Sequence, residues 1–128
     1  MATLVVPGPP GIPPEIPPRI PPEIPLEIPL EIADSSGARR RGLLGRDGVA
    51  GALLLTRTRG VHTLGMRFAV DVAYLDRELR VLSVRTMRPG RVGLPRLGAR
   101  QVLEAEAGAM AAWGVRAGVR LTVVRGCA

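Results

Sequence analysis

Hydrophobic and polar residues alternate along the middle of the chain. From His62 to Leu75, every second residue, up to Tyr74, is large and mostly apolar. The residues between them, among them Arg67 and Asp71, would face the opposite side. A period of two is typical of a β-strand with one buried face. We therefore predict one long strand over this segment, or two strands joined by a bend.

Shorter apolar segments on either side predict further strands and two short helices. Ser35 or Ser36 can cap a helix that continues to Leu44, and an alanine-rich segment over residues 107–113 predicts a second helix. Many short strands with two small helices are typical of a β-sandwich or a partly closed barrel, which is the fold class we expect. The further strands are expected at residues 51–56, 79–84, 101–105 and 119–124.

The first 29 residues differ from the rest of the chain in composition. Eleven of the 13 prolines lie between Pro7 and Pro29, and from Ile12 a four-residue unit of the type Ile-Pro-Pro-Glu repeats. Because proline fixes φ and lacks a backbone donor, helix and central strand are excluded, and polyproline II or disorder is expected. We therefore predict a proline-rich tail over residues 1–29 that does not fold with the mostly-β domain over residues 30–126.

The net charge is divided unevenly along the chain. The formal net charge is +7, yet residues 1–33 hold one arginine against four glutamates. Residues 34–128 hold 17 arginines against 7 acidic residues, a net charge of +10. A domain with this charge attracts phosphates and other anionic surfaces. A candidate anion-binding face lies in a glycine- and proline-rich loop and its flanks, with arginines at positions 85, 88, 91, 96 and 100.

Motifs of several known chemistries are absent from the sequence. It has no phosphate-binding loop, no dinucleotide-binding glycine motif and no paired cysteines. One histidine and one cysteine are too few for the usual zinc site, so we expect neither a metal nor another cofactor. With one Phe, one Tyr and one Trp, the chain offers no stacking platform for bases. Nucleic-acid binding would rest on phosphate contacts alone, and the sequence does not favour it.

The sequence also bears on location. The N-terminus lacks a basic segment followed by an apolar run, so no secretory signal is expected. No uncharged apolar stretch approaches the roughly 18 residues that a membrane-spanning helix needs. The single cysteine, Cys127, fits a reducing compartment. We therefore expect a cytoplasmic protein without a membrane span.

A few polar residues of the central segment are candidates for chemistry. Histidine is the side chain that ordinarily exchanges its proton near neutral pH, and the chain has one, His62. The guanidinium of Arg67 suits a carboxylate or a phosphate, but an ion pair at the rim of the sheet is the structural alternative. Along a straight strand, Arg67 and Asp71 are about 13 Å apart and need separate partners. Met66 fits the core at least as well as a site.

Several segments, taken in order, resemble the domain of unknown function 192 family. The resemblance spans residues 30–124 and implies a compact β-sandwich-like fold, with no activity to carry over. The family's recurrent polar positions correspond to five ligand-binding candidates, namely Arg46, His62, Met66, Arg67 and Asp71. The segments that carry the resemblance are Arg40-Arg41-Gly42-Leu43-Leu44-Gly45-Arg46, Gly51-Ala52-Leu53-Leu54-Leu55, His62-Thr63-Leu64-Gly65-Met66-Arg67-Phe68, Asp71-Val72-Ala73-Tyr74-Leu75-Asp76, Arg91-Val92-Gly93, Val102-Leu103-Glu104 and Gly114-Val115-Arg116-Ala117-Gly118.

Three hypotheses for function remain open. The first is a non-catalytic binding module that takes a small anion or an acidic protein partner through an arginine-rich face near His62, Arg67 and Arg46. The second is an enzyme of unassigned reaction that uses His62 and Asp71 for proton transfer. The third is a scaffold or assembly protein whose proline tract recruits a partner. The sequence favours the two non-enzymatic hypotheses over the enzyme, and it leaves the oligomeric state open.

Overall fold

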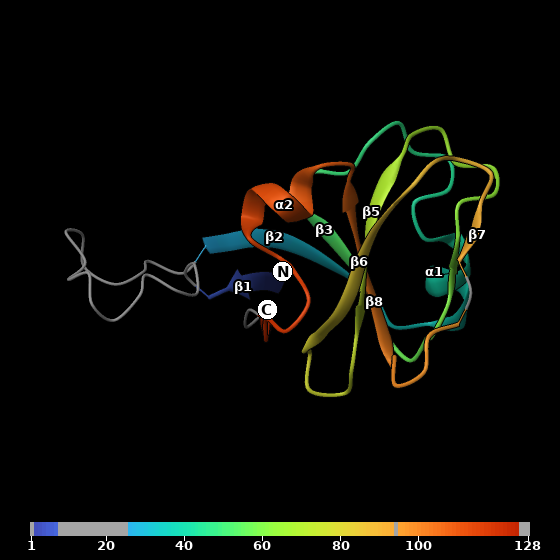
Figure 1. The fold of residues 1–128 in the computed structure, drawn as a ribbon. Helices are drawn as coiled ribbons and strands as arrows, with labels where there is room; N and C mark the ends of the chain where they lie inside the picture. Colours follow the sequence, from blue (N-terminus) through green and yellow to red (C-terminus); the bar gives the residue numbers. More distant parts are fainter. Residues whose placement is uncertain (1, 8–25, 94, 126–128) are drawn as a thin grey trace, which may run out of the picture.

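A computed structural model describes residues 2–7, 26–93 and 95–125 of the chain, and these residues fold around a curled β-sheet (Figure 1). The mostly-β fold with two short helices that the sequence predicts is confirmed. The elements are β1 (Ala2–Val6), β2 (Leu26–Ala33), α1 (Ser36–Arg41), β3 (Ala52–Leu55), β4 (Val61–His62), β5 (Val70–Leu75), β6 (Val81–Met87), β7 (Val92–Gly93), β8 (Gln101–Glu106), α2 (Ala109–Trp113) and β9 (Thr122–Arg125).

Seven of these strands form one sheet in the order β6-β5-β8-β3-β2-β1-β9, and β4 pairs with β7 beside it. Neighbouring strands are antiparallel except β2 and β3, which are parallel. The two edges of the sheet approach each other where the Val81 N–H donates to the Val119 carbonyl at 2.8 Å and the Leu121 N–H donates to the Leu79 carbonyl at 2.9 Å. These contacts close the curled sheet only in part, because β6 and β9 themselves do not pair.

Residues 2–6 and 26–29 lie inside the sheet, and the prediction of a tail over residues 1–29 is wrong for both segments. β1 pairs with β2 on one side and with β9 on the other. Leu4 and Val6 are each only 1% exposed. The register pairs Val6 with Leu26, so the proline-rich segment connects two strands of one antiparallel pair. The proline argument did not apply to residues 2–6, which precede the first proline; residues 8–25, where polyproline II was expected, lie outside the described residues.

A proline inside β2 is compatible with its central place in the sheet. The carbonyl oxygen of Pro29 faces Gly51, where an added Cβ would lie 2.2 Å from it. The nitrogen and carbonyl of one strand residue point to the same edge, so the missing N–H of Pro29 also faces this side. The parallel pairing with β3 begins one residue later, at Leu30 and Ala52. The proline therefore lies just beyond the paired part of this edge.

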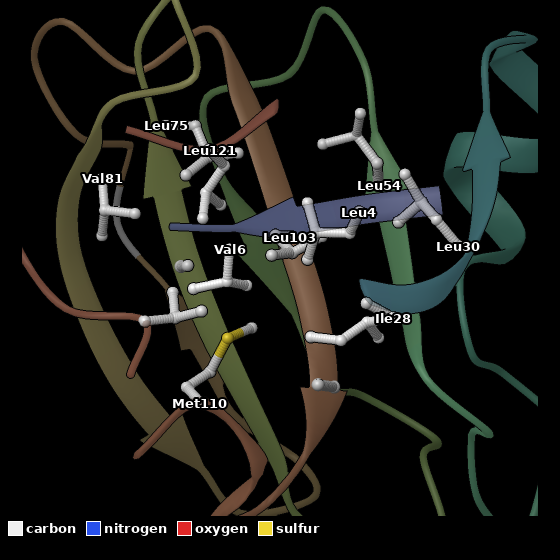
Figure 2. Packing of buried hydrophobic residues seen from close by; sticks show 14 residues of the cluster. Leu4, Val6, Ile28, Leu30, Leu54, Leu75, Val81, Leu103, Met110 and Leu121 are labelled. Carbon is white, nitrogen blue, oxygen red and sulfur yellow. The ribbon is translucent and has the colours of Figure 1, made fainter. Parts of the chain in front are cut away.

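Apolar clusters cover both faces of the sheet, and every residue of β5 is therefore buried. The first cluster fills the inside of the curled sheet, where Met110 of α2 joins side chains from the strands (Figure 2). It includes Leu4, Val6, Ile28, Leu30, Leu54, Leu75, Leu103 and Leu121. The second lies on the outer face, against α1 and the loops around β4 and β7, and includes Leu43, Leu53, Leu55, Met66, Val70, Val72, Tyr74 and Val102.

Residues 70–75 form β5 as predicted, but residues 63–69 form a turn and a loop rather than a strand, and His62 ends the short strand β4 of the second sheet. The Met66 N–H donates to the Thr63 carbonyl at 3.1 Å, and Gly65 has a φ of +76° that favours glycine. Thr63, expected on the polar face, is fully buried. Its hydroxyl donates to the Arg88 carbonyl at 2.6 Å and accepts from the Arg91 N–H at 2.8 Å. The turn breaks the alternation, so side chains before Val70 do not follow the faces of β5.

Candidate functional site

A cavity of about 240 Å³ lies on the outer face of the sheet, beside α1 and β4. Two of the five predicted site residues, His62 and Met66, line it. His62 is exposed at the end of β4, whereas Met66 is buried. The full lining is Arg39, Arg40, Arg41, Gly42, Leu43, Leu44, Leu55, Thr58, Gly60, Val61, His62, Met66 and Glu104.

The α1 helix contributes the positive side of this cavity. As predicted, Ser35 caps it, with its hydroxyl oxygen accepting from the Ala38 N–H at 3.0 Å. The helix ends at Arg41 rather than at the predicted Leu44, because Gly42 takes a φ of +48° and its N–H donates to the Ala38 carbonyl. Because the helix ends early, the chain turns toward the cavity, and residues 42–44 line it together with the three arginines of the helix.

Glu104 of β8 is the functional candidate that sequence reasoning missed. It is 2% exposed, and its Oε2 atom has no hydrogen-bond partner among the described residues. Its register partners, Leu53 and Val72, belong to the outer cluster, so its carboxyl group points away from water. Burial raises the pKa of this carboxyl to about 7. The available signal was an acidic residue in the middle of the apolar segment Val102–Ala105.

The backbone at Gly42 passes close to the Glu104 carboxyl. A Cβ placed on Gly42 would lie 3.8 Å from Glu104 Oε1, in ordinary contact. The backbone at the end of α1 therefore covers one side of the carboxyl, while the cavity meets it from another. A carboxyl group with a pKa near 7 exists in both protonation states at neutral pH, so it can donate or accept a hydrogen bond there.

Arg46 and Arg67, two further candidates, lie outside the lining and are held in ion pairs. Arg46 makes two hydrogen bonds to Glu31, at 2.9 and 2.8 Å, which lower the pKa of that glutamate. Arg67 contacts Asp47 at 3.0 Å, and both side chains are largely exposed. Exposed pairs of this kind contribute about 1 kcal/mol or less. The structure therefore does not bring these two guanidinium groups together with His62.

Asp71, the fifth candidate, faces the opposite side of the sheet from the cavity. Its Oδ1 accepts from the Thr86 hydroxyl at 2.6 Å, and its Oδ2 accepts from the N–H groups of Gly108 and Met110 at 2.9 and 3.1 Å. These bonds attach the start of α2 to β5 and β6. The pairing of His62 with Asp71 for proton transfer therefore has no geometric basis, because β5 side chains alternate and Asp71 belongs to the inner face.

We expect Asp71→Ala to destabilise the domain by about 2 kcal/mol, because it leaves the buried Met110 N–H without an acceptor. Asp71→Asn should cost about 1 kcal/mol or less, since its oxygen can accept from both N–H groups while its amide donates to the Thr86 hydroxyl. Urea unfolding of the three proteins measures the difference. Equal losses in both variants would contradict this structural role.

Among the residues described, no three or more His, Cys, Asp or Glu side chains gather in a way that could hold a metal ion. Within the same residues, neither helix is long and apolar enough to cross a membrane.

The fold and the cavity define a small mostly-β domain that carries a hollow of about 240 Å³ on the outer face of its sheet. The profile of the DUF192 family (domain of unknown function 192), described as "Uncharacterized ACR", matches residues 21–123, and the chain belongs to this family. The resemblance found in the sequence is thus confirmed. No curated protein matches the chain.

Two solved structures have a similar fold. A protein of unknown function from Novosphingobium aromaticivorans is 18% identical, with a TM-score of 0.71 over 94% of this chain and 83% of that chain. A putative transcription regulator from Sinorhizobium meliloti is 17% identical, with a TM-score of 0.74 over 96% of this chain and 94% of that chain. At these identities the likeness concerns the fold alone.

Proposed function

We propose that the chain is a small-ligand-binding module and that the cavity beside α1 is its binding site. The observation that carries this proposal is the Glu104 carboxyl, which is 2% exposed and lines the cavity with an unpartnered Oε2 atom. A buried polar atom without a partner costs about 1–3 kcal/mol, a cost that a bound ligand or an ordered water removes. A polar group of this kind in the lining of a cavity can form the hydrogen bond that orients a bound ligand.

The lining favours a small organic anion. Three arginines of α1 and His62 lie along the cavity, against the single carboxyl of Glu104, whose negative charge is reduced at neutral pH by burial. The remaining lining is mainly apolar, from residues such as Leu55 and Met66. These features fit a ligand with a short carbon skeleton. Its anionic group would lie near the arginines, its carbon skeleton against the apolar lining, and a hydrogen-bonding group at Glu104. This proposal keeps the small anion expected from the sequence, but without Arg46 and Arg67.

A thermal-shift titration with short hydroxy- and amino-carboxylates tests the proposal. A ligand at about one hundred times its dissociation constant adds about 2.7 kcal/mol of stability, which raises the melting temperature measurably. We expect the rise to be lost in His62→Ala and reduced in Glu104→Gln. Arg67→Ala is the matched control, because its side chain lies outside the lining and should leave the rise unchanged. A panel with no stabilising member, or an equal loss in the control, would contradict the proposal.

Proton-transfer catalysis in the same cavity is the second candidate function. The observation that favours it is a buried carboxyl with a pKa of about 7 in the same lining as His62. This pair replaces the His62 and Asp71 pair of the sequence hypothesis. If a stabilising carboxylate is found, NMR spectra of that carboxylate decide between the two functions. Its conversion by the wild type but not by Glu104→Gln supports catalysis, and an unchanged spectrum supports binding alone.

Recruitment of a partner by the proline tract stays a hypothesis, because residues 8–25 lie outside the described residues. The cytoplasmic location and the acidic protein partner stay predictions as well.

A further inference from the structure

A second groove, of about 440 Å³, lies at one end of the sheet. Three segments that are distant in sequence line it: the loop after β3, the turn between β5 and β6, and the start of β8. It shares Thr58 with the cavity beside α1, and its other lining residues are separate. The lining consists of Thr56, Arg57, Thr58, Arg59, Arg77, Arg100 and Gln101.

Hydrogen bonds hold the three segments in fixed positions relative to one another. The Thr58 N–H donates to the Arg100 carbonyl at 3.0 Å, and the Arg100 N–H donates to the Leu75 carbonyl at 2.8 Å. The Gln101 side-chain amide donates to the Asp76 carbonyl at 3.3 Å. Arg57 has a left-handed φ of +51°, which is uncommon for a large side chain. The four arginines are therefore presented by a pre-organised backbone.

The positive charge of this groove is not compensated by its own lining, which contains four arginines and no carboxylate. Arg59 and Arg77 are exposed, and within the described residues they have neither an ion pair nor a side-chain hydrogen bond. Arg57 donates to the Asp34 carbonyl at 3.2 Å, and Arg100 donates to the Ala99 carbonyl at 3.1 Å. Like charges gathered in one groove repel one another, and a ligand of opposite charge relieves this repulsion.

The nearby carboxylates are already occupied. Asp34 accepts from the Thr56 hydroxyl at 2.9 Å and pairs with Arg125 at 3.3 Å. Asp76 accepts from the N–H groups of Glu78 and Arg80, each at 2.9 Å, inside the turn. Glu78 is exposed on that turn and is not part of the lining. These acidic groups reduce the local potential but do not neutralise the guanidinium groups in the groove.

We propose that this groove binds a compact ligand with clustered phosphates, of the di- or triphosphate type. Four guanidinium groups match the three to four negative charges of such a ligand, and each can bind phosphate oxygens through two parallel N–H groups. A single carboxylate would leave most of the positive charge unpaired. The volume of the groove suits a small molecule. This inference is independent of the ligand proposed for the cavity beside α1.

Isothermal titration calorimetry of the full chain with inorganic tripolyphosphate, pyrophosphate and orthophosphate tests this inference at one fixed ionic strength. We expect one site that binds tripolyphosphate most tightly and orthophosphate most weakly. The double variant Arg59→Gln with Arg77→Gln should weaken tripolyphosphate binding by about tenfold or more, because it removes two charged hydrogen-bonding groups. Both side chains are exposed and unpaired, so its thermal unfolding should match that of the wild type.

The matched control is Arg88→Gln with Arg91→Gln, which changes the net charge equally on a different arginine-lined surface. Its affinity should stay within about twofold of the wild type, since only long-range attraction is altered. An equal loss in both double variants would overturn the inference, and so would tripolyphosphate binding no tighter than orthophosphate. A 20-base-pair DNA duplex that binds more tightly than tripolyphosphate would indicate an extended polyanion surface and overturn it too. His62→Ala should leave tripolyphosphate binding unchanged, which separates this site from the cavity.

Discussion

Removal of β1 is expected to unfold the domain. A chain that begins at Leu26 loses the strand between β2 and β9 and the buried side chains of Leu4 and Val6. Burial of each such side chain contributes about 1.5–3 kcal/mol. The two together approach the roughly 5–15 kcal/mol that keeps a whole domain folded. Circular dichroism during thermal unfolding should show no cooperative transition for residues 26–128, or a much lower melting temperature.

The control for this truncation keeps β1 and removes the proline tract. Because Val6 pairs with Leu26, a short turn that contains Asn-Gly can replace residues 7–25 and join the two strands as a hairpin. We expect this shortened chain to be at least as stable as the full chain, by up to about 2 kcal/mol, since each doubling of loop length costs about 0.6 kcal/mol of closure entropy. If residues 26–128 alone unfold as cooperatively as the full chain, β1 is dispensable and the tail predicted from the sequence is correct.

Glu104 is expected to make the domain less stable as the pH rises. Burial raises its pKa from 4.5 to about 7 in the folded state, so the folded chain binds this proton more tightly than the unfolded chain does. Below pH 4.5 the carboxyl is protonated in both states, so its titration does not change the free energy of unfolding. Between these two pKa values the unfolded chain loses the proton before the folded chain does, so the free energy of unfolding falls as the pH rises. Above the higher pKa this loss reaches about 3 kcal/mol, because one pKa unit corresponds to about 1.4 kcal/mol.

Glu104→Gln isolates this contribution, because glutamine has the same shape and no charge. We expect the variant to be more stable than the wild type at pH 8, by up to about 3 kcal/mol, and closer to it at pH 5. Glu106→Gln, on an exposed residue of the same strand, is the control and should keep the wild-type pH dependence. Glu31 and Asp34 do not interfere, since their pKa values are lowered and they stay ionised over this range. Parallel pH profiles for wild type and Glu104→Gln would contradict the assignment.

The elements that the sequence predicts well depend on local chemistry. The Ser35 cap requires only a hydroxyl three residues before an N–H group, and the structure contains it. The connection between the strands expected up to Leu75 and from residue 79 requires only the polar residues 76–78, and the structure joins β5 to β6 there. The expected strands at 51–56 and 101–105 differ from β3 and β8 by one residue at their ends.

The candidate site was predicted only in part, because it depends on contacts between distant segments. The face on which Asp71 lies relative to His62 is set by the turn at Thr63, whose partners are 25 and 28 residues away. The cavity forms only where the chain at Gly42 passes close to Glu104 of β8, so Glu104 could not be recognised as part of it from its neighbours in sequence. β1 was missed for the same reason, since its partner β9 lies at the other end of the chain.

The position of the proline repeat between β1 and β2 also affects how the gene can change. The two strands are fixed by their register with each other and with β9 and β3, whatever the length of the connection. Insertion of one more four-residue unit lengthens the connection between Val6 and Leu26, at a cost of roughly 0.2 kcal/mol in loop-closure entropy. Slippage during replication that adds or removes such units therefore changes the length of the protein without changing the sheet. An unrelated four-residue insertion within β2 would instead shift its register with β1 or with β3.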